Sequence, residues 1–262
     1  FILSAAPKTI DEIRALAPDA LRAYRLLEAA TVKTPYVGLG LALVLLAIAI
    51  GTFKLPKIPQ AQHQIGEKVN DSIWKHRNLI FGAIGIFVYV GAEVAIGSFL
   101  VNYFTQPDIG GFTEKVAASF VAFYWGGAMV GRFIGSGLLQ KMKAGHLLGI
   151  CAVCAAALVT ISMLSTGHFA MWSIILVGFF NSIMFPSIFA LGVAELGPLT
   201  GDGSGVMIMA IVGGAILPLA QGAIADRIGI HHAFFLPVIC YLYILFFALS
   251  GSKPNSERHA RT

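Results

Sequence analysis

Residues 78–104 read NLIFGAIGIFVYVGAEVAIGSFLVNYF, and this stretch decides the fold class. It is apolar along its whole length and carries one charged side chain, Glu93. A helix needs about 20 apolar residues to cross the ~30 Å hydrocarbon core of a bilayer. The stretch is long enough, and it lacks the alternation that barrel strands require. It therefore predicts a transmembrane helix.

Apolar windows of similar length lie on both sides of this stretch. They cover residues 36–55, 115–140, 145–166, 169–195, 204–226 and 231–250. Backbone groups in lipid must be hydrogen-bonded within the segment that crosses, so each window is expected to be helical. The sequence predicts an all-α integral membrane protein with about seven transmembrane helices.

The composition points to the same class of protein. Of the 262 residues, 57% are hydrophobic and 12% are charged, whereas soluble domains have about 25% charged residues. A chain with this few charged residues cannot cover a water-facing surface. The lipid bilayer is therefore the first expected partner. The net charge of +5 comes from basic residues in the connections between windows. The positive-inside rule explains that placement, and no nucleic-acid partner is expected.

The polar segments between the windows give the expected domain organisation and orientation. Residues 1–35 are expected to hold the end of a span and an extracytoplasmic loop with a short amphipathic helix, and residues 36–55 a span. Residues 56–77 are expected to form a cytoplasmic central loop, 78–250 a six-helix bundle, and 251–262 a cytoplasmic tail. This orientation gathers most of the Lys and Arg on the cytoplasmic side, as the positive-inside rule requires. These are Lys54, Lys57, Lys68, Lys75, Arg77, Lys141, Lys143, Lys253, Arg258 and Arg261.

Four strings resemble the fucose/glucose/galactose–proton symporters of the major facilitator superfamily. FVYVGAEVAIGSFLVNY at 87–103 resembles the seventh span of that family, and NSIMFPSIFAL at 181–191 resembles the tenth. Residues 205–226, with GGAILP at 213–218, resemble the eleventh. GRFIG at 131–135, ahead of KMK at 141–143, resembles the signature between spans eight and nine.

The resemblance implies a major facilitator fold in which this chain supplies spans six to twelve. The N-terminal half is then expected to be missing and to be the partner of this half. The implied function is uptake of a small neutral sugar coupled to protons by alternating access, in the bacterial cytoplasmic (inner) membrane. Protons are the implied coupling ion, and no cofactor is expected.

Glu93 is the first candidate site residue. A charge in the bilayer interior is costly and marks a functional position by default. Tyr89 and Gly97 lie one turn away on either side and share its face. We expect Glu93 and Tyr89 to line a sugar cavity and Glu93 to couple proton movement, since a poorly solvated cavity favours the neutral carboxyl. The alternative is a structural carboxylate bonded to a neighbouring helix.

The tenth-span window contains two further candidates. The Asn181 amide offers a donor and an acceptor, which suits a sugar hydroxyl; the alternative is interhelical hydrogen bonding. Pro186 removes a backbone donor and is expected to kink the helix at a gating bend. Arg132, near the cytoplasmic end of its span, is expected to act in gating rather than as a substrate ligand.

The remaining substrate-binding candidates are aromatic or amide side chains. Tyr124 and Trp125 are expected to stack on a sugar ring, with lipid-facing or packing roles as the alternative. Asn102 and Gln221 lie nearer the outer ends of their spans and are expected at the rim of the cavity.

The same residues bear on other classes of function. A membrane-embedded enzyme needs clustered His, Asp or Glu, or a nucleophile motif such as GxSxG, and the sequence has neither. Cys151 and Cys154 have CxxC spacing, but no further ligands complete a metal set, and the same holds for His231 and His232. No metal site is expected. A transporter of another neutral solute and a non-transporting sugar sensor remain as alternatives.

Overall fold

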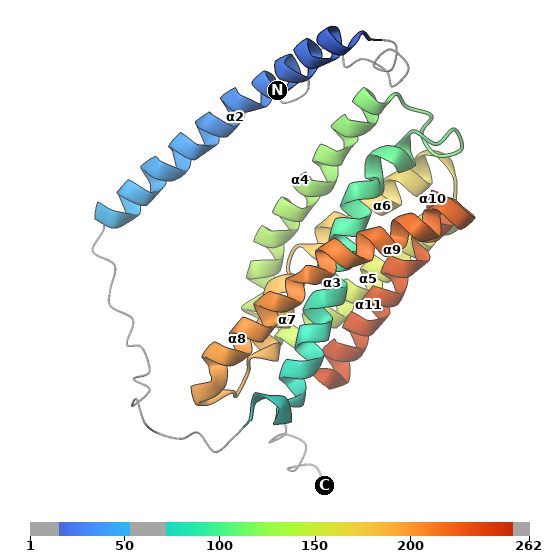
Figure 1. The fold of residues 1–262 in the computed structure, drawn as a ribbon. Helices are drawn as coiled ribbons and strands as arrows, with labels where there is room; N and C mark the ends of the chain where they lie inside the picture. The colour runs from blue at the N-terminus through green and yellow to red at the C-terminus, as the bar shows by residue number, and fades with distance from the viewer. Residues whose placement is uncertain (1–15, 53–71, 254–262) are drawn as a thin grey trace. The chain divides into compact units, whose positions relative to one another are not determined.

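The computed structural model describes residues 16–52 and 72–253, and these ranges are helices joined by short turns (Figure 1). No strand occurs in either range. The chain divides into two compact units, residues 1–62 and residues 63–262. The all-α prediction is confirmed. The predicted features within residues 1–15, 53–71 and 254–262 lie outside the described residues.

The first unit contains one long helix, α2, from Pro18 to Thr52. The sequence suggested a short amphipathic helix, then a separate span beginning at residue 36; the structure joins them into one helix. The leucine-, alanine- and arginine-rich stretch before residue 30 favours helix and leads directly into the apolar run. That apolar run, Tyr36–Ala49, is shorter than the other apolar windows.

The second unit contains six stretches that are long and apolar enough to cross a membrane. A 3-10 turn, η1 (Ile73–Lys75), precedes them. They are α3 (Arg77–Phe104); α4 (Glu114–Leu139); α5 (Ala144–Leu164); α6 (Gly167–Asn181) with α7 (Met184–Gly192); η2 (Gly197–Leu199), α8 (Thr200–Met209), η3 (Ala210–Val212) and α9 (Gly213–Ile228); and α10 (Ile230–Ala233), α11 (Phe235–Phe246) and η4 (Phe247–Gly251). Five of these stretches begin and end within about three residues of their predicted windows, whereas the fifth begins at Gly197, ahead of the predicted start at residue 204.

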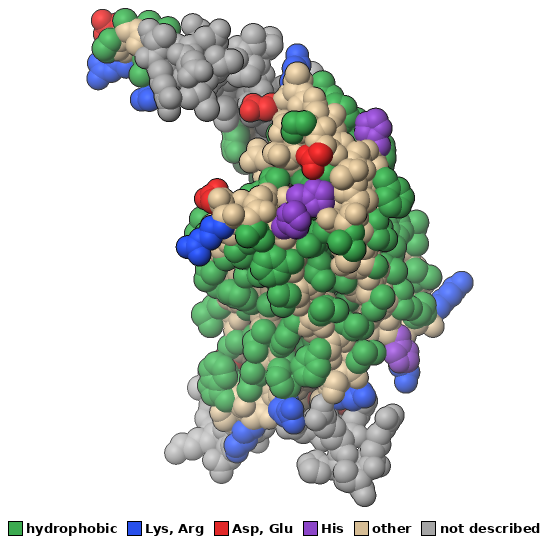
Figure 2. Space-filling view, turned by 90° about the vertical axis from the view of Figure 1, so that its right-hand side faces the viewer, with side chains coloured by type: hydrophobic (Ala, Val, Ile, Leu, Met, Phe, Trp, Pro, Cys, Tyr) green, Lys and Arg blue, Asp and Glu red, His purple; other side chains and the backbone are tan. Residues whose placement is uncertain are grey.

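Helix α3 occupies the centre of this bundle and packs against α7, α9 and α11 (Figure 1). Helix α4 packs mainly on α6, and α5 packs on α6 and α11. On the face that Figure 2 shows, hydrophobic side chains cover most of the middle of the bundle, and most charged side chains lie near its ends. This distribution is the one expected of helices whose solvent is lipid.

One glycine sets the closest approach of α3 to α9. A Cβ on Gly213 would collide with the backbone carbonyl of Phe87, and one turn later Leu217 covers Gly91. Small residues at such crossings let membrane helices pack by close backbone contact. The eleventh span therefore packs closely on α3 at Gly213.

Candidate functional site

The carboxyl of Glu93 lies in the middle of α3 and is partly buried. The Tyr89 hydroxyl, one turn earlier on the same face, interacts with this carboxyl. Arg132 of α4 lies close enough to contribute a favourable charge interaction. Tyr89 and Glu93 are therefore neighbours in the structure, as predicted. Arg132 also lies near Glu93, which the sequence alone did not indicate.

Asn181 is the centre of a buried hydroxyl cluster that joins four spans. Its Nδ2 donates to the Tyr124 hydroxyl of α4 at 3.0 Å, and its Oδ1 accepts from the Tyr241 hydroxyl of α11 at 2.9 Å. The Tyr89 hydroxyl donates to its backbone carbonyl at 2.8 Å. Asn181, Tyr124 and Tyr241 have no exposed surface, and Tyr89 has 2%.

This cluster bears on the two interpretations of Asn181. Its amide has a partner on each side, as in interhelical hydrogen bonding, and no surface is left for a solute in this conformation. A role in sugar binding remains a prediction for Asn181 and Tyr124. The sequence pointed to three members of the cluster but missed Tyr241, because no local signal relates the last span to the tenth.

The tenth span is interrupted next to this cluster. Helix α6 ends at Asn181 and α7 begins at Met184, with a turn at Ser182 and Ile183. Pro186 has no N–H to donate four residues back, so the Ser182 carbonyl lacks its helical donor. The Arg132 Nε donates to that carbonyl at 3.3 Å. The predicted discontinuity exists, and it lies one turn before the proline.

Arg132 therefore links two features of the site. Its Nε donates to the Ser182 carbonyl at the break in the tenth span, and its charge lies close enough to Glu93 to favour the ionised carboxylate. The sequence placed Arg132 near the cytoplasmic interface and left it without a defined partner. Its gating role remains a prediction.

Trp125 lies at the open side of this region. Its side chain is 50% exposed, and its indole ring lies 3.4 Å from where a Cβ on Gly97 would be, one turn after Glu93. Its ring meets that of Tyr124 edge to face, with centroids 5.2 Å apart. Tyr124 thus points into the core, while its neighbour Trp125 presents an accessible aromatic face near the carboxylate.

The two amides expected at the rim are placed differently. Asn102 is exposed near the end of α3, and its backbone carbonyl accepts from the side chains of Thr105 and Gln106. Gln221 of α9 is completely buried, and neither Nε2 nor Oε1 has a hydrogen-bond partner among the described residues. A buried amide with both groups unpaired is costly, and such groups commonly meet water or ligand. No pattern in the sequence indicated that Gln221 would be buried.

The spans differ in how much of their surface the bundle covers. Only 22% of the apolar window of α4 and 17% of that of the span containing α8 and α9 are buried, against 44–56% for the other four. Trp125 and Arg132 lie on α4, and Gln221 lies on α9. The least covered spans therefore carry several of the candidate residues.

Cys151 is buried and Cys154 is half-buried on α5, and both are free thiols. Among the described residues, no group of three or more His, Cys, Asp or Glu side chains is arranged to hold a metal ion.

Known proteins resemble this chain in sequence over most of its length, although no family model matches it. A glucose/galactose transporter of Brucella abortus biovar 1 (strain 9-941) is 52% identical over 226 residues, which are 86% of this chain and 55% of that protein. The L-fucose-proton symporter of Escherichia coli (strain K12) is 32% identical over 259 residues, 96% of this chain and 59% of the symporter. The chain thus spans little more than half the length of these curated relatives.

The fold is also shared with a solved transporter. The crystal structure of the major facilitator superfamily transporter FucP, in the outward conformation, matches with a TM-score of 0.79 and 30% sequence identity. The match covers 95% of this chain and 61% of FucP.

Proposed function

The chain belongs to the fucose/glucose/galactose–proton symporter family of the major facilitator superfamily, and from that premise we propose that the protein takes up a neutral sugar together with protons. The observation that carries the proposal is the Glu93 carboxyl inside α3, beside the Tyr89 hydroxyl. A carboxyl in a membrane interior suits a group that gains and loses a proton during a transport cycle.

The charges near the site favour a neutral substrate. An anion carrier would present an unpaired basic group to its cavity, whereas Arg132 already bonds the Ser182 carbonyl and interacts electrostatically with Glu93. The exposed face of Trp125 suits the apolar side of a sugar ring, and carboxyl and amide groups suit its hydroxyls. We assign sugar contact to Trp125, Glu93 and Gln221.

Alternating access requires elements that can bend. The break between α6 and α7 and the 3-10 turn η3 between α8 and α9 interrupt two spans. We propose that these breaks are the hinges, with Arg132 bonded across the first of them. Loss of the proton from Glu93 would leave a negative carboxylate that attracts Arg132 more strongly. This attraction would weaken the hydrogen bond from Arg132 to the Ser182 carbonyl at the break between α6 and α7.

The partner and the orientation belong to the same proposal. The open faces of α4 and of α8 and α9 would pack against a segment equivalent to the part of FucP that this chain does not match. We place the protein in a bacterial cytoplasmic membrane with the Lys141–Lys143 loop and the C-terminus on the cytoplasmic side, following the positive-inside rule.

The test is proton-coupled uptake in liposomes by the protein expressed from its full reading frame. Fucose, galactose and glucose are added in turn, with a non-sugar solute as control, and the internal pH is recorded. At least one sugar should acidify the interior. Glu93→Gln should abolish sugar-driven proton movement while sugar binding persists, whereas Glu114→Gln, at the exposed start of α4, should behave as wild type.

Other outcomes separate the alternatives. Uptake of sugar without proton movement would reject coupling. Sugar binding without uptake would indicate a sensor, and uptake of a different neutral solute alone would reject the sugar assignment.

A further inference from the structure

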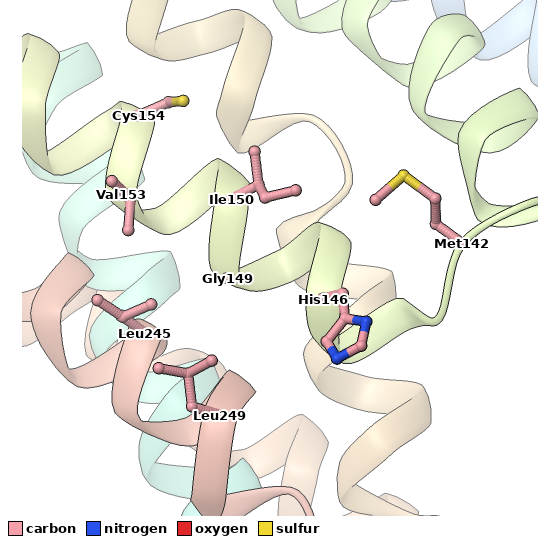
Figure 3. Close-up of a pocket in the computed structure, with 8 residues that line it drawn as sticks. All are labelled: Met142, His146, Gly149, Ile150, Val153, Cys154, Leu245 and Leu249. Atoms are coloured by element: carbon pink, nitrogen blue, oxygen red, sulfur yellow. The ribbon is translucent and has the colours of Figure 1, made fainter.

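A groove on the outside of the bundle is unrelated to the candidate site. It has a volume of about 560 Å³ and lies between α5 and α11, beside the loop that follows α4 (Figure 3). Its lining is apolar except for one imidazole. The lining residues are Met142, His146, Gly149, Ile150, Val153, Cys154, Leu245 and Leu249.

The groove runs along the membrane-spanning part of α5. Its lining extends from His146 to Cys154, about 12 Å of helix at 1.5 Å per residue. Ile150 is 48% exposed and Val153 is 49% exposed, so this wall faces the hydrocarbon and not the bundle interior. Gly149 is buried between the helices and leaves space because it has no side chain. The shape suits a flexible apolar chain lying along the helix.

One end of the groove is basic. Lys141 and Lys143 are exposed in the loop before α5, and His146 is exposed in its first turn. Lys253 follows η4, where the Ser252 Oγ lies 3.9 Å from the position of a Cβ on Gly145. The lysines therefore gather at one end of the groove.

No acidic side chain offsets this charge along the sequence. Residues 115–194 and 227–253 contain neither Asp nor Glu, and these ranges supply both walls of the groove and its basic end. Within the described part of the chain, Lys141, Lys143 and Lys253 form no ion pair. An apolar groove that ends in exposed lysines at a span boundary matches the two parts of an anionic lipid.

We propose that this groove binds an anionic phospholipid, with an acyl chain between α5 and α11 and the headgroup phosphate at Lys141, Lys143 and Lys253. A second copy of the chain fits less well. A two-fold axis along the membrane normal would bring the same lysines of both copies to the same membrane face, where they repel. The proposal is independent of which solute the protein carries.

Native mass spectrometry of the full chain in neutral detergent tests the proposal. Phosphatidylglycerol and phosphatidylcholine with identical acyl chains are titrated separately. Phosphatidylglycerol should bind more tightly. A lysine near the membrane surface contributes about fivefold to the affinity for anionic lipid, so Lys141→Gln with Lys143→Gln should weaken binding about 25-fold. Lys115→Gln, an exposed lysine at the other end of α4, is the matched control and should have no effect.

The apolar part is tested separately. Val153→Trp should fill the groove and reduce binding, whereas Ile161→Trp, exposed on the same helix outside the groove, should not. A phosphatidylglycerol with a photoreactive acyl chain should label residues 144–154 or 245–249. The substituted side chains are all exposed, so the variants should fold: Lys115, Lys141, Lys143, Val153 and Ile161.

Three results would overturn the proposal. Equal affinity for the two lipids would indicate an ordinary lipid-facing surface, and equal loss with Lys115→Gln would indicate a general charge effect. A dimer that persists without added lipid and is lost in Val153→Trp would identify a second copy as the occupant.

Discussion

Replacing Asn181 by leucine should lower the stability of the bundle by about 1–3 kcal/mol. Leucine has a similar volume, so the main loss is the two side-chain hydrogen bonds, from Nδ2 to the Tyr124 hydroxyl and from the Tyr241 hydroxyl to Oδ1. Interhelical hydrogen bonds in membranes contribute about 0.6 kcal/mol on average and about 1.7 kcal/mol at most. The bond from Tyr89 is made to the backbone carbonyl and should survive.

The measurement is reversible unfolding in mixed micelles, followed by far-ultraviolet circular dichroism. A double-mutant cycle with Tyr241→Phe isolates one bond, and its coupling energy should be at least about 0.5 kcal/mol. Asn102→Leu is the control, because Asn102 is exposed and should change stability by less than about 0.5 kcal/mol.

A coupling energy near zero between Asn181 and Tyr241 would show that their hydrogen bond does not stabilise the bundle. A variant Asn181→Leu that keeps its stability but loses sugar binding would assign the amide to the solute instead of to helix association. The experiment thus separates the two interpretations of this residue.

Two further substitutions test the close helix crossing and the broken span. Gly213→Ala should destabilise the bundle by about 1–3 kcal/mol, since the added methyl meets the Phe87 carbonyl. The control is Gly205→Ala, in the same span with open space around it, which should be neutral or stabilising by up to about 1 kcal/mol. Equal effects of the two substitutions in the same unfolding assay would contradict close packing at Gly213. Pro186→Ala should restore a backbone donor to the Ser182 carbonyl and raise stability by about 1 kcal/mol while slowing proton-coupled uptake; unchanged uptake in liposomes would argue against a hinge at this break.

Hydrophobicity alone predicted where the spans are. A helix in lipid must satisfy its own backbone and present about 20 apolar residues, so the windows from 78 to 250 coincide closely with the observed helices. The sequence predicted that a separate span begins at residue 36, but the structure has no break there. A polar segment that favours helix can continue directly into an apolar one. Local patterns also located the interruption near Pro186, since the missing N–H is a property of that residue.

Composition and spacing along one helix were enough to predict the membrane class, the helical spans, the membrane-embedded carboxyl of Glu93 and its helical neighbour Tyr89. Three other features became visible only in the folded bundle: Tyr241 completes the Asn181 cluster, Arg132 bonds the Ser182 carbonyl, and Gln221 is buried without a hydrogen-bond partner among the described residues. Each of these facts depends on which faces of separate helices meet. That is set by packing across the whole bundle, including close approaches such as Gly213 on Phe87, and no periodicity within a single span records it.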